Sequence, residues 1–60
     1  MIQKDYEYGI NGEPKIFYID YYPKNSIHTV RVSTFMRSVQ EKRLSEYPQQ
    51  GLVIASVGVL

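Results

Sequence analysis

Residues 15–23, KIFYIDYYP, carry apolar or aromatic side chains on both alternating sets of positions. In a β-strand, successive side chains point to opposite faces of the sheet. A strand with one face in water therefore alternates apolar with polar residues, whereas this stretch predicts a strand whose two faces are both covered. One face is expected to meet the protein's own core, and the second face is expected to meet another molecule.

Length and composition restrict the class of protein. Sixty residues predict a single domain, 1–60, and a chain of this size buries only about 60% of its unfolded surface. The chain has no cysteine, so a partner chain is the expected stabiliser, and a reducing, cytoplasmic location fits. Seven basic and six acidic residues leave a net charge of +1, which is too balanced for strong binding to duplex nucleic acid. The apolar run 51–60 is shorter than the about 20 residues of a membrane helix.

Asn11-Gly12 is the strongest turn signal in the chain. Both central residues of a type I′ turn have positive φ, which asparagine and glycine adopt readily. A two-residue loop at this point predicts an antiparallel hairpin between strands over residues 2–10 and 14–22. Its register pairs Tyr8 with Lys15, Tyr6 with Phe17, Lys4 with Ile19 and Ile2 with Tyr21.

A second turn at Lys24-Asn25 predicts a third strand over residues 27–33 and extends the sheet into an antiparallel meander. One side of this register is apolar and is predicted to face the core. The register pairs Tyr21 with His28, Ile19 with Val30, and Phe17 with Val32 on that side, and Tyr18 with Arg31 and Tyr22 with Ile27 on the other. The predicted core side holds Tyr6, Phe17, Ile19, Tyr21, Val30 and Val32.

A helix is predicted to cover this apolar side of the sheet. Ser33 or Thr34 would cap its first turn, because a hydroxyl oxygen can accept a hydrogen bond from an otherwise unpaired amide. Pro48 would end the helix, since the residue before a proline avoids the helical conformation. The apolar face of the helix, at about 100° per residue, would hold Phe35, Met36, Val39, Leu44 and Tyr47.

The last segment, residues 52–60, is rich in valine and apolar on both alternating sets, which is typical of a buried strand. A strand, a helix and a strand in succession favour a crossover connection, so this strand should run parallel to the 27–33 strand. The position of this last strand in the sheet is left open: it would lie beside the first strand, beside the third, or between them. The predicted fold class is α+β, a small β-β-β-α-β domain in which one helix packs on one side of an antiparallel meander with a C-terminal strand.

With one helix available, the second side of the sheet is left uncovered. This side is predicted to carry Ile16, Tyr18, Tyr22, Ile27 and Arg31, beside the carboxylates of Asp5, Glu7 and Asp20. Tyrosine and arginine are enriched at the centres of protein interfaces. The first five residues are therefore the candidate protein-interaction surface. Tyrosine is also a good strand former at half-exposed positions, which is the simpler interpretation of the same pattern.

A nucleic-acid surface is another interpretation of the uncovered side. Aromatic side chains on a sheet can stack on single-stranded bases. The basic residues that could contact phosphates are Arg31, Arg37, Lys42 and Arg43. The carboxylates predicted on the same side of the sheet would repel phosphates, which weighs against this interpretation.

Catalysis finds little support in the sequence. His28 is the only histidine, and a general base or a metal ligand needs partner groups. The carboxylates lack the spacing of a metal-binding loop, and the glycines do not form a phosphate-binding loop. No catalytic residue, cofactor or metal is expected, and the chain is predicted not to be an enzyme.

The favoured interpretation is a small, non-enzymatic accessory or regulatory protein that binds a larger protein. The contact would be made by the uncovered side of the sheet, by pairing along the edge of the last strand, or by both. Small cysteine-free chains of this kind are common among bacterial and temperate-phage accessory proteins. Two alternatives stay open: a single-strand or duplex nucleic-acid-binding protein, and a structural homodimer formed through the C-terminal strand or the tyrosine side of the sheet.

Overall fold

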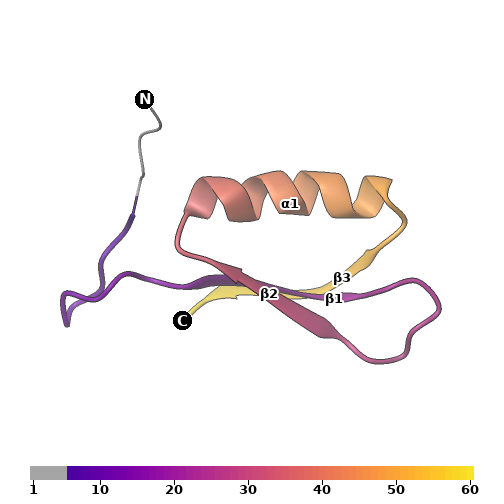
Figure 1. Cartoon of the computed structure of the whole chain (residues 1–60), viewed down its shortest axis with the longest axis horizontal. Helices are drawn as coiled ribbons and strands as arrows, with labels where there is room; N and C mark the ends of the chain where they lie inside the picture. Colours follow the sequence, from indigo (N-terminus) through magenta and orange to yellow (C-terminus); the bar gives the residue numbers. More distant parts are fainter. Residues whose placement is uncertain (1–5) are drawn as a thin grey trace.

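The computed structural model describes residues 6–60, which form one three-stranded sheet and one helix. The elements follow the chain as β1 (Phe17–Tyr22), β2 (Val30–Thr34), α1 (Arg37–Gln49) and β3 (Val53–Val59). The strands lie in the order β2-β1-β3, and α1 covers one face of the sheet (Figure 1). The predicted α+β class, with one helix on one side, is confirmed, and the element order is β-β-α-β. Within residues 6–60, no helix has the length and apolar character needed to cross a membrane.

The core lies between β1 and α1. Phe17 and Ile19 are 0% and 1% exposed, and no other apolar residue within 6–60 is fully buried. Tyr21 continues this side of the strand and packs on Tyr47 of α1, with ring centroids 5.0 Å apart. Tyr18 points the opposite way, because side chains alternate along a strand. The predicted orientation of β1, with Phe17 inward and Tyr18 outward, is confirmed.

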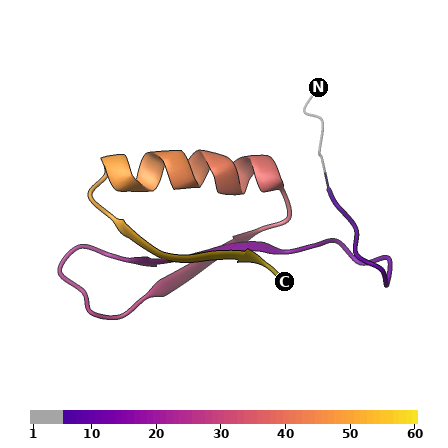
Figure 2. The ribbon, with the colours of Figure 1, turned by 180° about the vertical axis from the view of Figure 1, so that it is seen from behind.

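Residues 6–10 do not form the predicted first strand, and β3 occupies the place beside β1 that this strand was predicted to take. Tyr6 bridges to Met36 and not to Phe17. Figure 2 shows that the segment before β1 leaves the sheet at the end where α1 begins. Two further predicted pairs, Lys4 with Ile19 and Ile2 with Tyr21, fall on residues outside the described part of the chain.

The first turn does not have the predicted type I′ geometry. The Gly12 N–H donates to the carbonyl three residues earlier over 3.0 Å, so the turn is centred one residue before the Asn-Gly pair. Gly12 has a φ of 80°, whereas the φ of Asn11 is not positive. The resulting three-residue loop places Tyr8 opposite Pro14, and not opposite Lys15. The pairing continues one residue beyond Pro14, where the Lys15 N–H donates across the loop over 2.7 Å.

The loop between β1 and β2 is longer than predicted. It covers residues 23–29, with Asn25 at a φ of 60° and the His28 N–H donating to Ser26 Oγ over 3.1 Å. The register between the strands is therefore shifted by two residues. Such a shift keeps every side chain on its predicted side, because strands repeat every two residues. The observed pairs are Phe17 with Thr34, Tyr18 with Ser33, Ile19 with Val32, Asp20 with Arg31 and Tyr21 with Val30.

Three predicted positions near this hairpin are corrected by the structure. Val30 belongs to the predicted core but is exposed, because it begins an edge strand with a neighbour on one side only. Tyr6 was placed in the core as well, yet it lies outside the sheet, where its exposed ring meets Phe35 edge-on. Ile27 does not pair with Tyr22 and lies in the loop.

α1 begins at Arg37, and its N-cap position is Met36 instead of Ser33 or Thr34. β2 extends to Thr34, so both predicted cap residues belong to the strand. Thr34 Oγ1 still accepts a hydrogen bond from the Met36 N–H over 3.2 Å. Phe35 precedes the helix and is exposed, which corrects its predicted place on the buried helix face.

The side of α1 that faces the sheet is partly polar. Gln40 is the buried residue of this helix, and its Nε2 donates to the carbonyl oxygens of Tyr18 and Gly58, both over 3.0 Å. These two residues are paired across β1 and β3, so one side chain holds the helix against both strands. The helix ends at Gln49, one residue past Pro48, which was predicted to end it.

β3 pairs with the second edge of β1 and runs parallel to β2, as predicted, because both strands are antiparallel to β1. The register shifts once, between the pair Asp20–Ser56 and the pair Tyr21–Ile54. Ala55 lies between these pairs without a partner on β1, which makes a β-bulge. The bulge keeps Ile54 on the helix side of the sheet.

Candidate protein-binding surface

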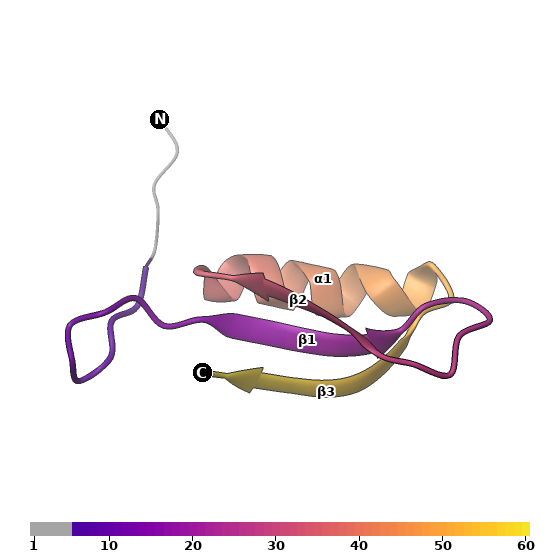
Figure 3. The same ribbon diagram turned by 60° about the horizontal axis from the view of Figure 1, so that its bottom comes forward.

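The sheet face opposite α1 is called the open face. In Figure 3 the strands lie in front of α1, and no segment of residues 6–60 covers them from that side. Because paired residues share a face, the register assigns alternate positions of each strand to the open face. They are Tyr18, Asp20 and Tyr22 from β1, Arg31 and Ser33 from β2, and Val53, Ser56 and Gly58 from β3.

Three side chains at the centre of the open face hold one another in place. The Arg31 guanidinium donates to both carboxylate oxygens of Asp20, over 2.7 and 3.0 Å. Its Cζ also lies 4.1 Å from the centroid of the Tyr18 ring, which is a cation–π contact. The bidentate ion pair and the stacked ring together fix the plane of the guanidinium. This tyrosine–arginine cluster therefore has a defined shape before any partner binds.

The ion pair shifts the protonation equilibria of both partners. The hydrogen bond from Arg31 lowers the pKa of the Asp20 carboxyl below its ordinary value of 3.8; desolvation opposes this effect, and the Arg31 charge adds to it. The same hydrogen bond raises the pKa of Arg31. At neutral pH the centre of the open face thus carries a compensated pair of charges.

The Tyr18 ring crosses from β1 onto β3, where it lies over Gly58. A Cβ atom at position 58 would lie 2.5 Å from Tyr18 Oη and 2.6 Å from Cζ. These distances are shorter than the contacts that Cβ atoms make in proteins. Glycine is the residue that leaves room for the ring, because it has no side chain. The open face is therefore flat and aromatic at this point.

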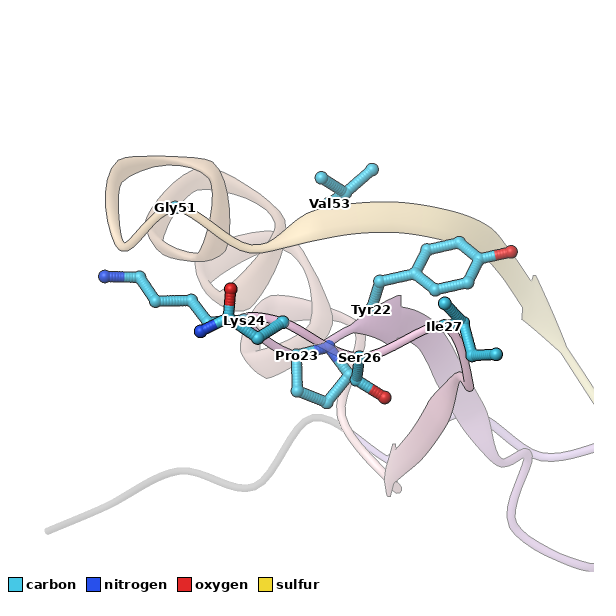
Figure 4. Close-up of a pocket in the computed structure, with 8 residues that line it drawn as sticks. Tyr22, Pro23, Lys24, Ser26, Ile27, Gly51 and Val53 are labelled. Carbon is cyan, nitrogen blue, oxygen red and sulfur yellow. The ribbon is translucent and has the colours of Figure 1, made fainter.

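A hollow lies at one end of the open face, beside the β1–β2 loop (Figure 4). Its apolar part is formed by Tyr22, Ile27 and Val53, and the last two are 86% and 60% exposed. Aliphatic side chains exposed together in this way are typical of a contact site for another molecule. The full lining is Tyr22, Pro23, Lys24, Asn25, Ser26, Ile27, Gly51 and Val53.

Lys24 lines the hollow, and its side chain runs toward Gly51 (Figure 4). A Cβ atom at Gly51 would lie 3.0 Å from Lys24 Cε, so the lysine side chain runs along the turn that follows the helix. Its ammonium group therefore lies near the carboxyl end of α1, where the helix dipole is negative. The position suits a structural role of Lys24 in addition to any contact with a partner.

Four of the five predicted contact residues form two groups, and the fifth lies apart from both. Tyr18 and Arg31 contact each other at the centre of the open face, whereas Tyr22 and Ile27 share the hollow. Ile16 is half-buried just before β1, where its carbonyl accepts a hydrogen bond from the N–H of the last residue over 2.7 Å. It lies at the opposite end of the strand from the hollow.

The four basic residues predicted to contact nucleic acid do not form one basic surface. Arg31 is paired on the open face, and Arg37 at the start of α1 donates to both carboxylate oxygens of Glu7 over 2.9 and 3.2 Å. This hydrogen bond lowers the pKa of Glu7 below its ordinary value of 4.5. Lys42 is exposed and Arg43 half-buried on α1. Two of the four cations thus already have carboxylate partners.

Sequence reasoning missed two features of this surface. Asp20 was predicted in an acidic edge but not as the partner of Arg31, although opposite charges on neighbouring strands are a recognisable signal of pairing. Val53 and Lys24 were not assigned to a shared hollow, because its walls come from loop 23–29 and from the chain after α1. Only the tertiary fold brings these two segments together.

No protein-family model, curated protein or solved structure matches the chain. Within residues 6–60, no three histidine, aspartate or glutamate side chains gather into a group that could hold a metal ion. What the open face offers is contact surface: a stacked tyrosine, a paired arginine and an apolar hollow.

Proposed function

We propose that this chain is a small, non-enzymatic accessory or regulatory protein that binds a larger protein through the open face of its sheet. The observation that supports this most is that a pre-shaped tyrosine–arginine cluster and an exposed apolar hollow share a face that residues 6–60 leave uncovered. We assign it to the cytoplasmic accessory proteins of bacterial or temperate-phage type, on the basis of its size and its lack of cysteine.

The cluster and the hollow would contribute to binding in different ways. Tyr18 and Arg31 are residue types that dominate interface hot spots. Because Asp20 already fixes the guanidinium, little side-chain freedom is lost when a partner binds. A guanidinium has five N–H donors and Asp20 uses two, so donors remain for carbonyl groups of the partner. The hollow would bury an apolar side chain, at about 25 cal/mol per Å² of apolar area removed from water.

Photo-crosslinking in the native host tests the proposal. A photoreactive phenylalanine analogue at Tyr22 should crosslink to one defined protein, whereas the same analogue at Lys42, exposed on α1, should not. Ile27→Ser should abolish the crosslink from Tyr22 and leave the circular dichroism spectrum unchanged, because Ile27 is an exposed loop residue. Equal crosslinking from both analogues, or crosslinking only to a second copy of the chain, would contradict the proposal.

Titration of labelled single- and double-stranded oligonucleotides tests the alternative that the chain binds nucleic acid. We expect no binding at low salt, because phosphate contact by Arg31 would compete with its pairing to Asp20. Binding that is lost steeply with added salt, and that Arg31→Ala weakens, would replace the proposed protein partner with a nucleic acid.

A further inference from the structure

β3 forms a free edge of the sheet. It pairs with β1 on one side, and no strand within residues 6–60 pairs on its other side. The Leu60 N–H donates to the Ile16 carbonyl, so in this part of the chain the even-numbered residues point their backbone groups toward β1. The alternation turns the N–H and C=O groups of Val57 and Val59 outward, toward the free edge.

The side chains of these two valines add an apolar strip to the same edge. Val57 pairs with Ile19 and Val59 pairs with Phe17, so both valines lie on the helix side of the sheet. Their partners on β1 are buried, yet Val57 is 43% exposed and Val59 is exposed as well. A strand that extended the sheet here would cover the valines together with the backbone edge.

The free edge of β3 carries no charge. From Tyr47 to Leu60 the sequence contains no lysine, arginine, aspartate or glutamate. Proteins usually protect free edges with charged residues, prolines or very short strands. β3 has seven residues and neither a charge nor a proline, whereas the opposite edge, β2, has five residues and carries Arg31. β3 is therefore the unprotected edge of this sheet.

A second copy of β3 fits this edge. When two VIASVGV strands run antiparallel, every register brings only uncharged side chains opposite each other, most of them small or β-branched. No charge is buried and no like charges are opposed. A two-fold axis perpendicular to the sheet would then join the two sheets into one and place both helices on the same side.

The single chain also has little core of its own. Phe17 and Ile19 are the fully buried apolar residues within 6–60. Domains of this size without disulfides or metals commonly depend on association for stability. Pairing at β3 would add buried valine side chains and paired backbone groups at the element that contacts β1 and α1.

We propose that β3 pairs antiparallel with β3 of a second copy, with Val57 and Val59 of both chains in the new ladder. The pairing goes beyond the proposed function, because it uses the edge of the sheet and leaves the cluster and hollow of the open face free. The dimer would present two copies of the open face on one continuous sheet.

Two valine variants with matched exposure test the pairing. Val57→Lys places a lysine on the β3 edge, and Val30→Lys places one on the β2 edge, where the valine is 42% exposed and also lies on the helix side. Sedimentation equilibrium of the wild type at micromolar concentration should show a dimer. Val57→Lys should raise the dimer dissociation constant on the order of 100-fold, because symmetry introduces each lysine twice. Val30→Lys should leave the constant unchanged.

A cysteine scan keeps the inference testable if Val57→Lys does not fold. The chain has no cysteine, so single cysteines placed along β3 can form disulfides only between copies. In a pair of strands related by a two-fold axis, the residue on the axis lies opposite the same residue of the other copy, at a Cα distance that a disulfide can bridge. Each step along the strand separates the two copies of a residue by about 7 Å more. One position should therefore crosslink in high yield and its neighbours in low yield.

Several results would overturn the pairing: a monomeric wild type at high micromolar concentration, equal weakening by Val57→Lys and Val30→Lys, or disulfides spread evenly along β3. The crosslink from Tyr22 to a larger protein does not depend on any of these results. Failure of the dimer and failure of the proposed function can thus be told apart.

Discussion

Tyr18 has contacts on both faces of the sheet. Its ring lies between Arg31 and Gly58 on the open face, and its carbonyl oxygen accepts a hydrogen bond from Gln40 of α1. The side chain therefore shapes the open face, while the backbone of the same residue anchors the helix. Substitutions of the residues that contact Tyr18 should therefore affect both the stability of the fold and the shape of the open face.

Gly58→Ala should destabilise the domain by about 1–3 kcal/mol, because the added methyl group overlaps the Tyr18 ring, which can move only by leaving Arg31. Urea denaturation measures the loss. Gly9→Ala is the control, since the nearest atom to its new Cβ lies at 3.4 Å. In a Tyr18→Ala background the loss caused by Gly58→Ala should largely vanish. Equal losses in both backgrounds would show that the ring is not the cause.

Asp20 should make the stability of the fold sensitive to acid. Because Arg31 lowers the pKa of Asp20 in the folded state, the pair stabilises the fold above the ordinary carboxyl pKa of 3.8, and this stabilisation is lost as the pH falls through the lower, folded-state pKa. Asp20→Asn should lower the urea midpoint at neutral pH and flatten its decline in acid. Glu13→Gln, in the exposed first turn, is the control. A decline as steep in Asp20→Asn as in the wild type would refute the role of the pair.

Among the elements, β1 was predicted with the correct faces, although it begins at Phe17 and not at residue 14, and β2 was predicted with the correct faces but the wrong register. The alternation along FYIDYY places Phe17 inward whatever the exact pairing. The register depends on loop 23–29, where Ser26 and His28 form a local turn that lengthens the loop. The amino-acid composition of the turn does not determine the length of the loop. Arg31 was therefore predicted on the correct side of the sheet but opposite the wrong residue.

Long-range packing determines which strand pairs with the second edge of β1. The sequence of the Asn-Gly turn carries no information about this packing. Asn11-Gly12 suits a three-residue loop as well as a two-residue loop, since here only Gly12 has a positive φ. The segment 53–59 is uncharged and rich in valine, whereas residues 2–10 include charged side chains. The valine-rich segment can therefore lie beside the buried Phe17 and Ile19 without bringing a charged side chain to them, and it is the partner of β1.

Gln40→Leu tests how α1 is held on the sheet. Leucine has a similar volume but cannot donate to the carbonyls of Tyr18 and Gly58, so we expect a loss of about 1–3 kcal/mol in unfolding free energy, measured in urea. Gln49→Leu is the control, because this exposed side chain donates only to the Ser45 carbonyl within the helix. A Gln40→Leu protein as stable as the wild type would show that apolar contacts alone position the helix.

The molecule as a whole has a small core and much exposed apolar surface. Phe17 and Ile19 are buried, whereas Phe35, Val53 and Leu60 are exposed. Chain length and the lack of cysteine predict that a partner stabilises the fold, and this stays a prediction. The edge of the last strand was also proposed from the sequence as a contact surface, whereas the hollow could not be assigned, because its walls come together only in the folded chain.

The urea midpoint of the wild type should rise with protein concentration, because association stabilises only the folded state. Val57→Lys should have a lower midpoint that does not depend on concentration, and Val30→Lys should follow the wild type. Denaturation curves at two or more concentrations make the measurement. A wild-type midpoint that stays constant would mean that folding is not coupled to pairing at β3.

The bulge at Ala55 determines where β3 can be shortened. Because Ala55 has no partner on β1, its deletion would join Ile54 to Ser56 in a regular ladder, and all later side chains would keep their present side. Deletion of Val57 would instead turn Gly58 toward the helix and carry the next valine onto the open face. The strand thus contains one spare residue, and evolution could remove it without inverting the rest of the strand.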